Sequence, residues 1–352
     1  MIQLLERLGL EVPIIQAPMA GTSTPALAAA VSGAGGLGSI GVGAATTERA
    51  RAMIDAVRQR TERAFNVNVF CHQPAVADAA REAAWIERLR PQFERYDAEP
   101  PARLHEIYTS FLFDQPMQAL LLEAAPPVVS FHFGLPPAEV ISALKAKGVM
   151  LFASATSLGE GRQVEAAGCD AVVAQGWEAG GHRGVFDPDA PDDQLGTFAL
   201  TRLLVRHLSI PVIAAGGIMD GAGIAAALTL GAAAAQLGTA FIACDESDAD
   251  EGHRAALASE AARHTTMTPV ISGRPARALA NRFTAFSLGP GAPQPAYPIA
   301  YDAGKALNAA AKARGDYGWG AQWAGQAAPL SRALPAEGLM RELKAELAEA
   351  LS

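Results

Sequence analysis

Short apolar runs alternate with amphipathic segments from residue 12 to residue 242. The apolar runs are bounded by Gly or Pro, and each is followed by a longer stretch in which apolar positions recur at helical spacing. Strands of a parallel sheet are buried on both faces, so they are expected to be continuously apolar. The predicted strands are 12–17, 38–42, 64–70, 128–133, 149–153, 171–175, 211–215 and 234–242. The predicted helices between them are 24–32, 47–60, 137–147, 158–167, 197–208 and 221–230.

Two α/β architectures fit this alternation, a closed barrel and an open doubly wound sheet. The open sheet places a Gly-x-Gly-x-x-Gly turn after its first strand, with an acidic residue near the end of the second. Here the first predicted strand ends in QAPMAG, residues 16–21, which lacks that glycine pattern. The sequence therefore predicts a (β/α)8 TIM barrel.

Two segments fall outside the barrel pattern. Residues 71–127 are rich in charge and helix formers, and we expect them to form a helical lid over the barrel mouth. Residues 245–352 contain Ala-rich helical stretches at 254–263, 302–313 and 339–351, with a Gly/Pro-rich connector at 287–298. Because neither segment resembles a linker, we expect the tail to pack on a barrel formed by residues 1–244 and to contribute to the active site.

Composition favours a large globular core, since 50% of the residues are hydrophobic and 18% are charged. The net charge of −8 argues against a nucleic-acid or anionic membrane partner, which would require clustered Lys and Arg. The three cysteines, Cys71, Cys169 and Cys244, are too scattered for a disulfide framework or a metal site, so we expect buried thiols. The apolar stretch 26–45 is interrupted by glycines, and no secretory signal is evident, so a cytoplasmic protein is expected.

Glycine-rich turns follow the last two predicted strands. These are AAGGI at residues 214–218, containing Gly216 and Gly217, and QLGTA at residues 236–240, containing Gly238. In barrels this corner commonly binds a phosphate through main-chain amides and the N-terminus of a short helix. The alternative is that the glycines only permit tight turns.

A second Gly-rich segment, residues 175–184, follows the sixth predicted strand and contains one histidine, His182. Such a loop can fold over a planar ligand, and an imidazole can exchange a proton near neutral pH. The alternative for His182 is an ordinary surface residue. Glu178 and Arg183 in the same segment are expected to pair with each other.

Two further polar residues end predicted strands at the same rim. His132 ends the fourth strand, where it is either a site residue or a hydrogen-bonded core histidine. Asn68 ends the third strand, where its amide serves either a flavin ring or the barrel itself.

Taken together, these segments resemble the nitronate monooxygenase family, formerly 2-nitropropane dioxygenases, and specifically its first class. The matching stretches are 16–21, 65–70, 130–135, 168–186, 211–217, 236–241 and 272–283. The segments 175–184 and SGRPAR, residues 272–277, are the specific ones.

The resemblance implies non-covalent FMN, with His182 as the catalytic base and His132 beside it. Implied substrate-facing residues are Tyr108, Tyr297, Tyr301 and Lys305, and the spacing of the last two puts them on one helix face or makes them an exposed pair. The implied flavin contacts are Ala17, Pro18, Met19, Asn68, Gln175, Gly180, Gly181, Gly216, Gly217, Gln236, Leu237, Gly238 and Thr239. Trp177 is bulkier than this loop normally carries, and we expect it to narrow the pocket.

The activity implied by the resemblance is oxidation of small alkyl nitronates, plausibly propionate 3-nitronate, by O₂ through a flavin semiquinone. The products are a carbonyl compound and nitrite or nitrate. NAD(P)H-dependent reductases, such as enoyl-thioester or quinone reductases, use the same fold and are the enzymatic alternative. A non-catalytic flavin- or phosphate-binding barrel is the alternative of another class. The expected partners are small molecules alone, and the sequence makes no prediction of oligomeric state.

Overall fold

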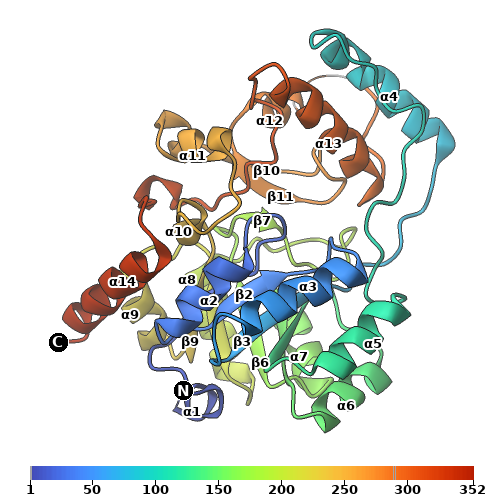
Figure 1. The fold of residues 1–352 in the computed structure, drawn as a ribbon. Helices are drawn as coiled ribbons and strands as arrows, with labels where there is room; N and C mark the ends of the chain where they lie inside the picture. The colour runs from blue at the N-terminus through green and yellow to red at the C-terminus, as the bar shows by residue number, and fades with distance from the viewer. Residues whose placement is uncertain (1, 288, 290) are drawn as a thin grey trace.

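The computed structural model describes residues 2–287, 289 and 291–352, and it has two layers (Figure 1). The lower layer is a parallel eight-stranded sheet in the order β1-β9-β8-β6-β5-β4-β3-β2, and a parallel bridge between Ile15 and Leu37 joins its two edges. The prediction of a (β/α)8 barrel is therefore confirmed. The strands are β1 (Ile14–Gln16), β2 (Gly38–Gly41), β3 (Phe65–Phe70), β4 (Val128–His132), β5 (Met150–Ala155), β6 (Ala171–Gln175), β8 (Val212–Ala215) and β9 (Ala234–Leu237).

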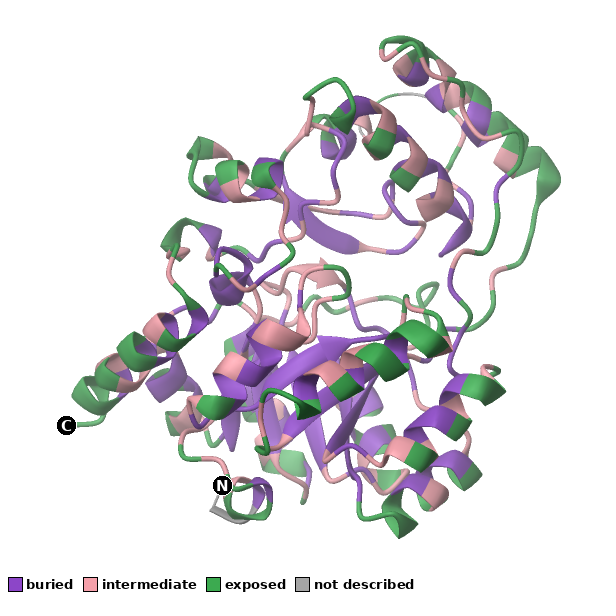
Figure 2. Ribbon diagram, in the orientation of Figure 1, coloured by how far each residue is buried: buried purple, intermediate pink, exposed green. Residues whose placement is uncertain are grey.

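An outer ring of helices covers the barrel, with buried inner faces and exposed outer faces (Figure 2). Side chains at the helix N-termini fix where several of these helices begin; Thr46, for example, accepts a hydrogen bond from the Arg49 amide. A short helix, α1 (Ile2–Leu8), precedes the first strand. The ring consists of α2 (Pro25–Gly33), α3 (Thr47–Arg58), α5 (Gln115–Ala124), α6 (Ala138–Ala146), α7 (Leu158–Ala166), α8 (Thr197–His207), α9 (Gly221–Thr229) and α14 (Ala336–Ala350).

Two helices of the ring, α5 and α14, come from the two segments that fall outside the barrel pattern of the sequence. The last helix, α14, packs against α9 and α2, the place that an eighth barrel helix occupies. The boundary after residue 244 stays a prediction, but the chain returns to the barrel at its end. Similarly, α5 packs between α3 and α6. Placing all of residues 71–127 over the barrel mouth was therefore wrong for this helix.

The upper layer combines α4 (Ala79–Glu94), which packs on α13, with most of the C-terminal segment. The predicted helices 254–263 and 302–313 correspond to α11 followed by the 3₁₀ helix η1, and to α13. The predicted connector 287–298 includes Leu288 and Pro290, which lie outside the described residues. The elements are α11 (Glu251–Leu257), η1 (Glu260–Arg263), β10 (Thr265–Thr268), β11 (Ala276–Leu279), α12 (Arg282–Phe286), α13 (Ile299–Lys312) and η2 (Ala328–Leu330).

A small antiparallel sheet, β10-β11-β7, joins the two layers. Its third strand, β7 (Gly181–His182), comes from the Gly-rich loop after β6, and His182 is paired with Ala276 of β11. The sequence analysis assigned only helical stretches and a connector to the C-terminal segment, so it missed the strands β10 and β11. The short strand pairs are set by contacts distant in the sequence, which periodicity does not reveal.

The predicted strand 234–242 is also corrected. The β9 ladder ends at Leu237, and Thr239–Ile242 form a short helix, α10. After Leu237 the neighbouring strand β1 has also ended, so no ladder partner continues. The buried apolar run of α10 has the same sequence appearance as a strand.

The three cysteines are buried and unpaired, which confirms that expectation. Within the described ranges, no helix is both long and apolar enough to cross a membrane. In the same residues, no group of three or more His, Cys, Asp or Glu side chains is arranged to hold a metal ion.

Candidate active site

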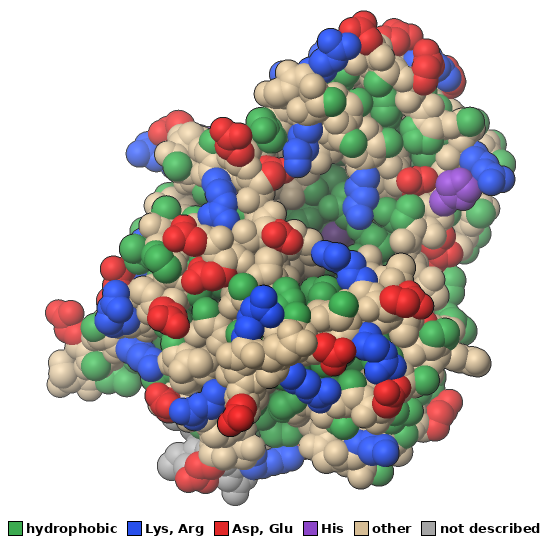
Figure 3. Space-filling model, in the orientation of Figure 1, with side chains coloured by type: hydrophobic (Ala, Val, Ile, Leu, Met, Phe, Trp, Pro, Cys, Tyr) green, Lys and Arg blue, Asp and Glu red, His purple; other side chains and the backbone are tan. Residues whose placement is uncertain are grey.

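A cavity of about 550 Å³ lies at the carboxyl ends of the barrel strands. Figure 3 shows this side of the molecule hollowed between the two layers, with hydrophobic side chains inside and basic residues on the rim. Its size is typical of a cofactor or small-molecule site. The predicted site residues that line it are Ala17, Pro18, Met19, Asn68, Tyr108, His132, Gln175, Gly180, Gly181, His182, Gly216, Gly217, Gln236, Gly238, Thr239, Tyr297, Tyr301 and Lys305.

Leu237 is the predicted contact that the structure does not bring to the cavity. Its side chain is packed in the core between β9 and the outer helices. Its carbonyl accepts a hydrogen bond from the Ala17 amide at 2.8 Å, which ties β9 to the end of β1.

One end of the cavity is formed by the turns after β8 and β9. Gly217 has a φ of 70°, which only glycine adopts easily, and it turns the main chain along the cavity wall. In the described part of the chain, the amides of Gly217, Gly238 and Thr239 donate no hydrogen bond to protein. Unpaired amides beside the N-terminus of α10 suit an anion such as a phosphate.

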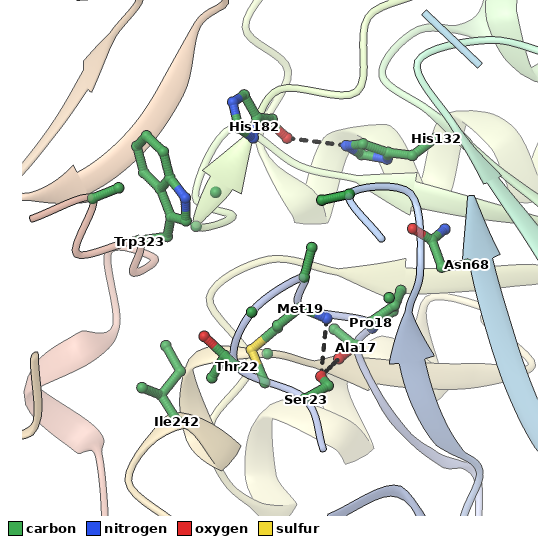
Figure 4. Close-up of a pocket in the computed structure, with 18 of the residues that line it drawn as sticks. Ala17, Pro18, Met19, Thr22, Ser23, Asn68, His132, His182, Ile242 and Trp323 are labelled. Carbon is green, nitrogen blue, oxygen red and sulfur yellow. Dashed lines mark hydrogen bonds between the residues drawn. The ribbon is translucent and has the colours of Figure 1, made fainter. Parts of the chain in front are cut away.

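The turn after β1 forms the floor of the cavity and is held by two residues that sequence reasoning missed (Figure 4). Ser23 accepts hydrogen bonds from the Met19 amide at 2.9 Å and from Gln16 Nε2 at 2.8 Å. Gln16 also accepts the Ser39 amide through Oε1 at 2.8 Å, so it links β1 to β2. This network holds the main chain of residues 17–23 in place. The sequence signal that could have indicated it is a polar residue, Gln16, within an apolar predicted strand.

Asn68 and Gln175 both line the cavity, and their side chains also form hydrogen bonds with neighbouring parts of the barrel. Asn68 Nδ2 donates to the Ser130 hydroxyl at 2.9 Å, so the amide supports the barrel; Asn68 also lies at the cavity wall, and its contact with a flavin stays a prediction. Gln175 Nε2 donates to the His182 carbonyl at 2.9 Å, and its Oε1 accepts the Gly184 amide at 2.7 Å. Gln175 therefore shapes the Gly-rich loop around His182.

Both ring nitrogens of His132 are used by protein groups. Nε2 lies 3.2 Å from the His182 carbonyl, which can only accept, so Nε2 carries the proton. Nδ1 then accepts from the Ser154 hydroxyl at 2.9 Å. Burial, chiefly, lowers the pKa of His132 to about 4, so the ring is neutral at pH 7.

His182 lies on the upper side of the cavity, between the two layers (Figure 4). Its ring is packed edge-on against Tyr297, with centroids 5.2 Å apart, and beside Trp323 at 5.1 Å. Nε2 is 2.8 Å from the Ser272 hydroxyl, whereas Nδ1 has no hydrogen bond within the described residues. Burial, with smaller contributions from His132 and Arg274, lowers the pKa of His182 to about 3.

The wall opposite the barrel carries three phenols and an ammonium group. Lys305 Nζ lies 4.8 Å from the Tyr108 ring centroid and 5.2 Å from that of Tyr301, which is cation–π distance. Tyr301 and Lys305 both lie on α13 and line the cavity, which excludes the alternative of an exposed pair. Burial raises the pKa of Tyr301 to about 12 and raises those of Tyr108 and Tyr297 as well, so the phenols stay protonated.

Lys305 forms no ion pair with any described carboxylate. The other lysine of α13, Lys312 at its C-terminal end, is paired with Asp250 at 2.9 Å. Desolvation lowers the pKa of Lys305 from its usual value. An unpaired, partly desolvated ammonium group in a cavity is an attractive site for an anionic ligand.

Two expectations for the Gly-rich loop were wrong. Arg183 pairs with Asp192 at 2.7 Å, and Glu178 accepts the Thr197 amide at 2.7 Å, so Glu178 and Arg183 do not pair with each other. Trp177 does not line the cavity. Its ring lies beside the guanidinium groups of Arg183 and Arg277, which hold it on the outside of the loop.

Trp323 and Ser272 also contact His182 and were not assigned from sequence. Trp323 comes from the segment before α14, and nothing near it in the sequence indicates a site. Ser272 opens the SGRPAR segment, so its position in a specific motif was the available signal.

The depressed histidine pKa values predict how the folded protein responds to acid. Because His132 and His182 have folded pKa values of about 4 and 3, they stay neutral while an unfolded histidine takes up a proton near pH 6.5. The stabilising contribution of the neutral rings is therefore complete above pH 6.5 and is lost as the pH falls toward 4. We expect the free energy of unfolding to decrease from pH 7 to pH 5, and the His182 ring resonances to show no titration over that range. A His182 midpoint near pH 6.5 would contradict this description.

The sequence of this chain is similar to those of known proteins over almost its whole length. The pattern that defines the nitronate monooxygenase family matches residues 3–346. A nitronate monooxygenase of Paraburkholderia phytofirmans is 65% identical over 349 residues, which cover 99% of this chain and 95% of that protein. One from Pseudomonas aeruginosa is 56% identical over 341 residues, covering 97% of each.

Two solved structures have a similar fold over almost the whole chain. The structure of nitroalkane oxidase from Streptomyces ansochromogenes has a TM-score of 0.90 and 42% identity, and 99% of each chain is covered. FabK from Thermotoga maritima is more distant, with a TM-score of 0.75 and 31% identity over 99% of this chain and 96% of that one.

Proposed function

The chain belongs to the nitronate monooxygenase family, a family of flavin-dependent oxidoreductases, and from that premise we propose that it uses FMN to oxidise a small anionic nitronate with O₂. The products are a carbonyl compound and nitrite or nitrate, and propionate 3-nitronate is the proposed substrate. The observation that carries this proposal is the cavity itself. It joins a corner of main-chain amides to a wall with an ammonium group and a neutral histidine, and neither the amides nor the ammonium group has a partner among the described residues.

The cavity residues fit FMN. The amides of Gly217, Gly238 and Thr239 would hold the phosphate, since all three residues line the cavity and their amides have no partner within the described residues. The rigid turn containing Pro18 and Met19 would support the flavin ring. Bound FMN supplies the electron transfer from nitronate to O₂, which no amino-acid side chain can provide.

The side chains of the opposite wall would bind the substrate anion. Lys305 offers a positive charge, and protonated Tyr301 and Tyr108 offer hydrogen-bond donors to carboxylate or nitro oxygens. Aromatic rings around them exclude water, which strengthens these interactions.

His182 is the residue that we assign to proton handling. It is neutral, it lines the cavity, and its Nδ1 has no hydrogen bond to any described protein group. Its free Nδ1 would act as base for a neutral nitroalkane, whereas a preformed nitronate has no proton to lose and depends less on His182. His132 has no free ring nitrogen, and we assign it to holding the His182 main chain.

Purification and steady-state assays test the proposal. The protein is expected to be yellow, to release FMN on denaturation, and to consume O₂ and form nitrite when given propionate 3-nitronate. Released FAD, or a colourless protein that does not take up FMN, would contradict the cofactor assignment. Rapid NADH oxidation without nitronate turnover would instead support the reductase alternative.

Substitution of Lys305 tests substrate binding. Lys305→Met removes the unpaired charge and keeps the apolar stem, so the KM for propionate 3-nitronate is expected to rise by about tenfold to a hundredfold, the cost of one charge-assisted hydrogen bond. The KM for a nitronate without a carboxylate should change less. Lys312→Met on the same helix is the matched control, because that lysine is already paired with Asp250. Equal effects of the two variants would show that Lys305 does not bind substrate.

A further inference from the structure

The SGRPAR segment fixes the main chain that carries His182. Residues His182 and Gly181 of β7 pair with Ala276 and Arg277 of β11, and the Arg183 amide donates to the Pro275 carbonyl at 2.8 Å. The position of His182 at the cavity is therefore set by a segment about ninety residues away in the sequence, a non-local contact that defines a rigid site.

The same segment places one side chain against the ring of His182. Ser272 is fully buried, and its Oγ lies 2.8 Å from His182 Nε2. Gly273 makes this position possible. Its φ is 93°, and a Cβ there would lie 2.6 Å from the Pro295 carbonyl oxygen and from the Tyr297 amide nitrogen. The turn can thus pass close to the chain leading into α13 only with glycine at residue 273.

The direction of the Ser272 hydroxyl follows from its second contact. Ser272 Oγ lies 3.2 Å from the Arg274 carbonyl, and a carbonyl oxygen can only accept. That carbonyl receives no other hydrogen bond within the described residues, so turning the hydroxyl away would leave it unpaired. The hydroxyl proton therefore belongs to the bond with Arg274, and the Ser272 oxygen is left to accept from His182.

We propose that Ser272 is a positioning residue that holds His182 as the tautomer protonated on Nε2, with the basic lone pair on Nδ1. The lone pair is then on the ring nitrogen that has no protein partner, and the ring lines the cavity. His132 reinforces the arrangement because its own Nε2–H donates to the His182 carbonyl, so both the main chain and the ring of His182 have fixed hydrogen-bond directions. Without Ser272 the two neutral tautomers would compete, and only one of them has the base at Nδ1.

The proposal rests on the proposed function for its catalytic meaning, but the tautomer itself can be observed without turnover. In protein labelled with ¹⁵N-histidine, the His182 ring signals are assigned as those missing in His182→Asn. We expect a protonated Nε2 and an unprotonated Nδ1 in the unsubstituted protein. Ser272→Ala is expected to give a mixture of the two tautomers, Ser272→Thr to keep the original one, and Ser209→Ala, at an exposed serine, to change nothing.

Turnover provides the second measurement. Ser272→Ala is expected to keep its flavin and to lower kcat on a neutral nitroalkane by about tenfold, the effect of one lost hydrogen bond, and Ser272→Thr should recover most of it. A His182 protonated on Nδ1, or an unchanged tautomer in Ser272→Ala, would overturn the proposal whatever the activity. If the protein does not oxidise nitronates, the proposed function fails, and the tautomer signals still decide the role of Ser272.

Discussion

Replacing His182 with asparagine is expected to lower turnover by roughly 10²–10⁴-fold, the usual contribution of general acid–base catalysis, while FMN stays bound. FMN should stay because its proposed phosphate contacts, the amides near Gly217 and Gly238, lie on other turns of the barrel. The loss should be larger for a neutral nitroalkane than for a preformed nitronate, because only the former has a proton to remove. Steady-state kinetics with flavin occupancy checked by absorbance measures both quantities.

His132→Asn is the comparison for this variant. His132 donates to the His182 carbonyl and accepts from Ser154, so its loss should loosen the loop and reduce turnover less than the loss of His182. Unchanged turnover of His182→Asn on both forms of the substrate would refute the assignment and leave His132 as the better candidate.

Replacing Gly217 with valine is expected to weaken FMN binding by about tenfold to a hundredfold. The Cβ of the new side chain would lie 3.3 Å from that of Glu178, which is too close for ordinary packing, so the turn that carries the amide would have to shift. Valine also resists the φ of 70°, so the amide would turn away from the anion. The lost charge-assisted hydrogen bond costs about 1.5–3 kcal/mol, which corresponds to a factor of about ten to a hundred in Kd. Titration of the apoprotein with FMN, followed by flavin fluorescence, gives the change in Kd.

Gly315→Val is the matched control for backbone strain. Gly315 has a φ of 74°, close to that of Gly217, but it lies in a turn after α13 where a Cβ would meet nothing within 4 Å. The control should lose stability comparably and still bind FMN. If both variants bind FMN as well as the unsubstituted protein, the phosphate does not lie at the proposed corner.

Much of the barrel could be predicted because its physical cause is local. Strands buried on both faces are continuously apolar, and helix starts carry capping residues such as Thr24 and Ser157. The glycine turns after β8 and β9 were found for the same reason, since a tight turn at the end of a strand requires particular residues. Predicting 234–242 as one strand was wrong because a short buried helix such as α10 has the same apolar pattern.

What the sequence did not reveal depends on contacts between distant segments. The pairing of β7 with β11, the return of α14 to the barrel and the approach of Trp323 to His182 each join residues far apart in the chain. The tyrosine and lysine positions on the cavity wall came from family resemblance, since Tyr301 and Lys305 alone could equally form an exposed helix pair. Their shared position at the cavity could be seen only in the folded chain.

Anaerobic mixing of the purified protein with propionate 3-nitronate, and separately with NADH, shows whether this cavity brings an anionic nitronate to a bound flavin. We expect the flavin absorbance to change rapidly with nitronate, to recover when O₂ is admitted with formation of nitrite, and to change far more slowly with NADH. Rapid bleaching by NADH together with no spectral change on adding nitronate would contradict the account.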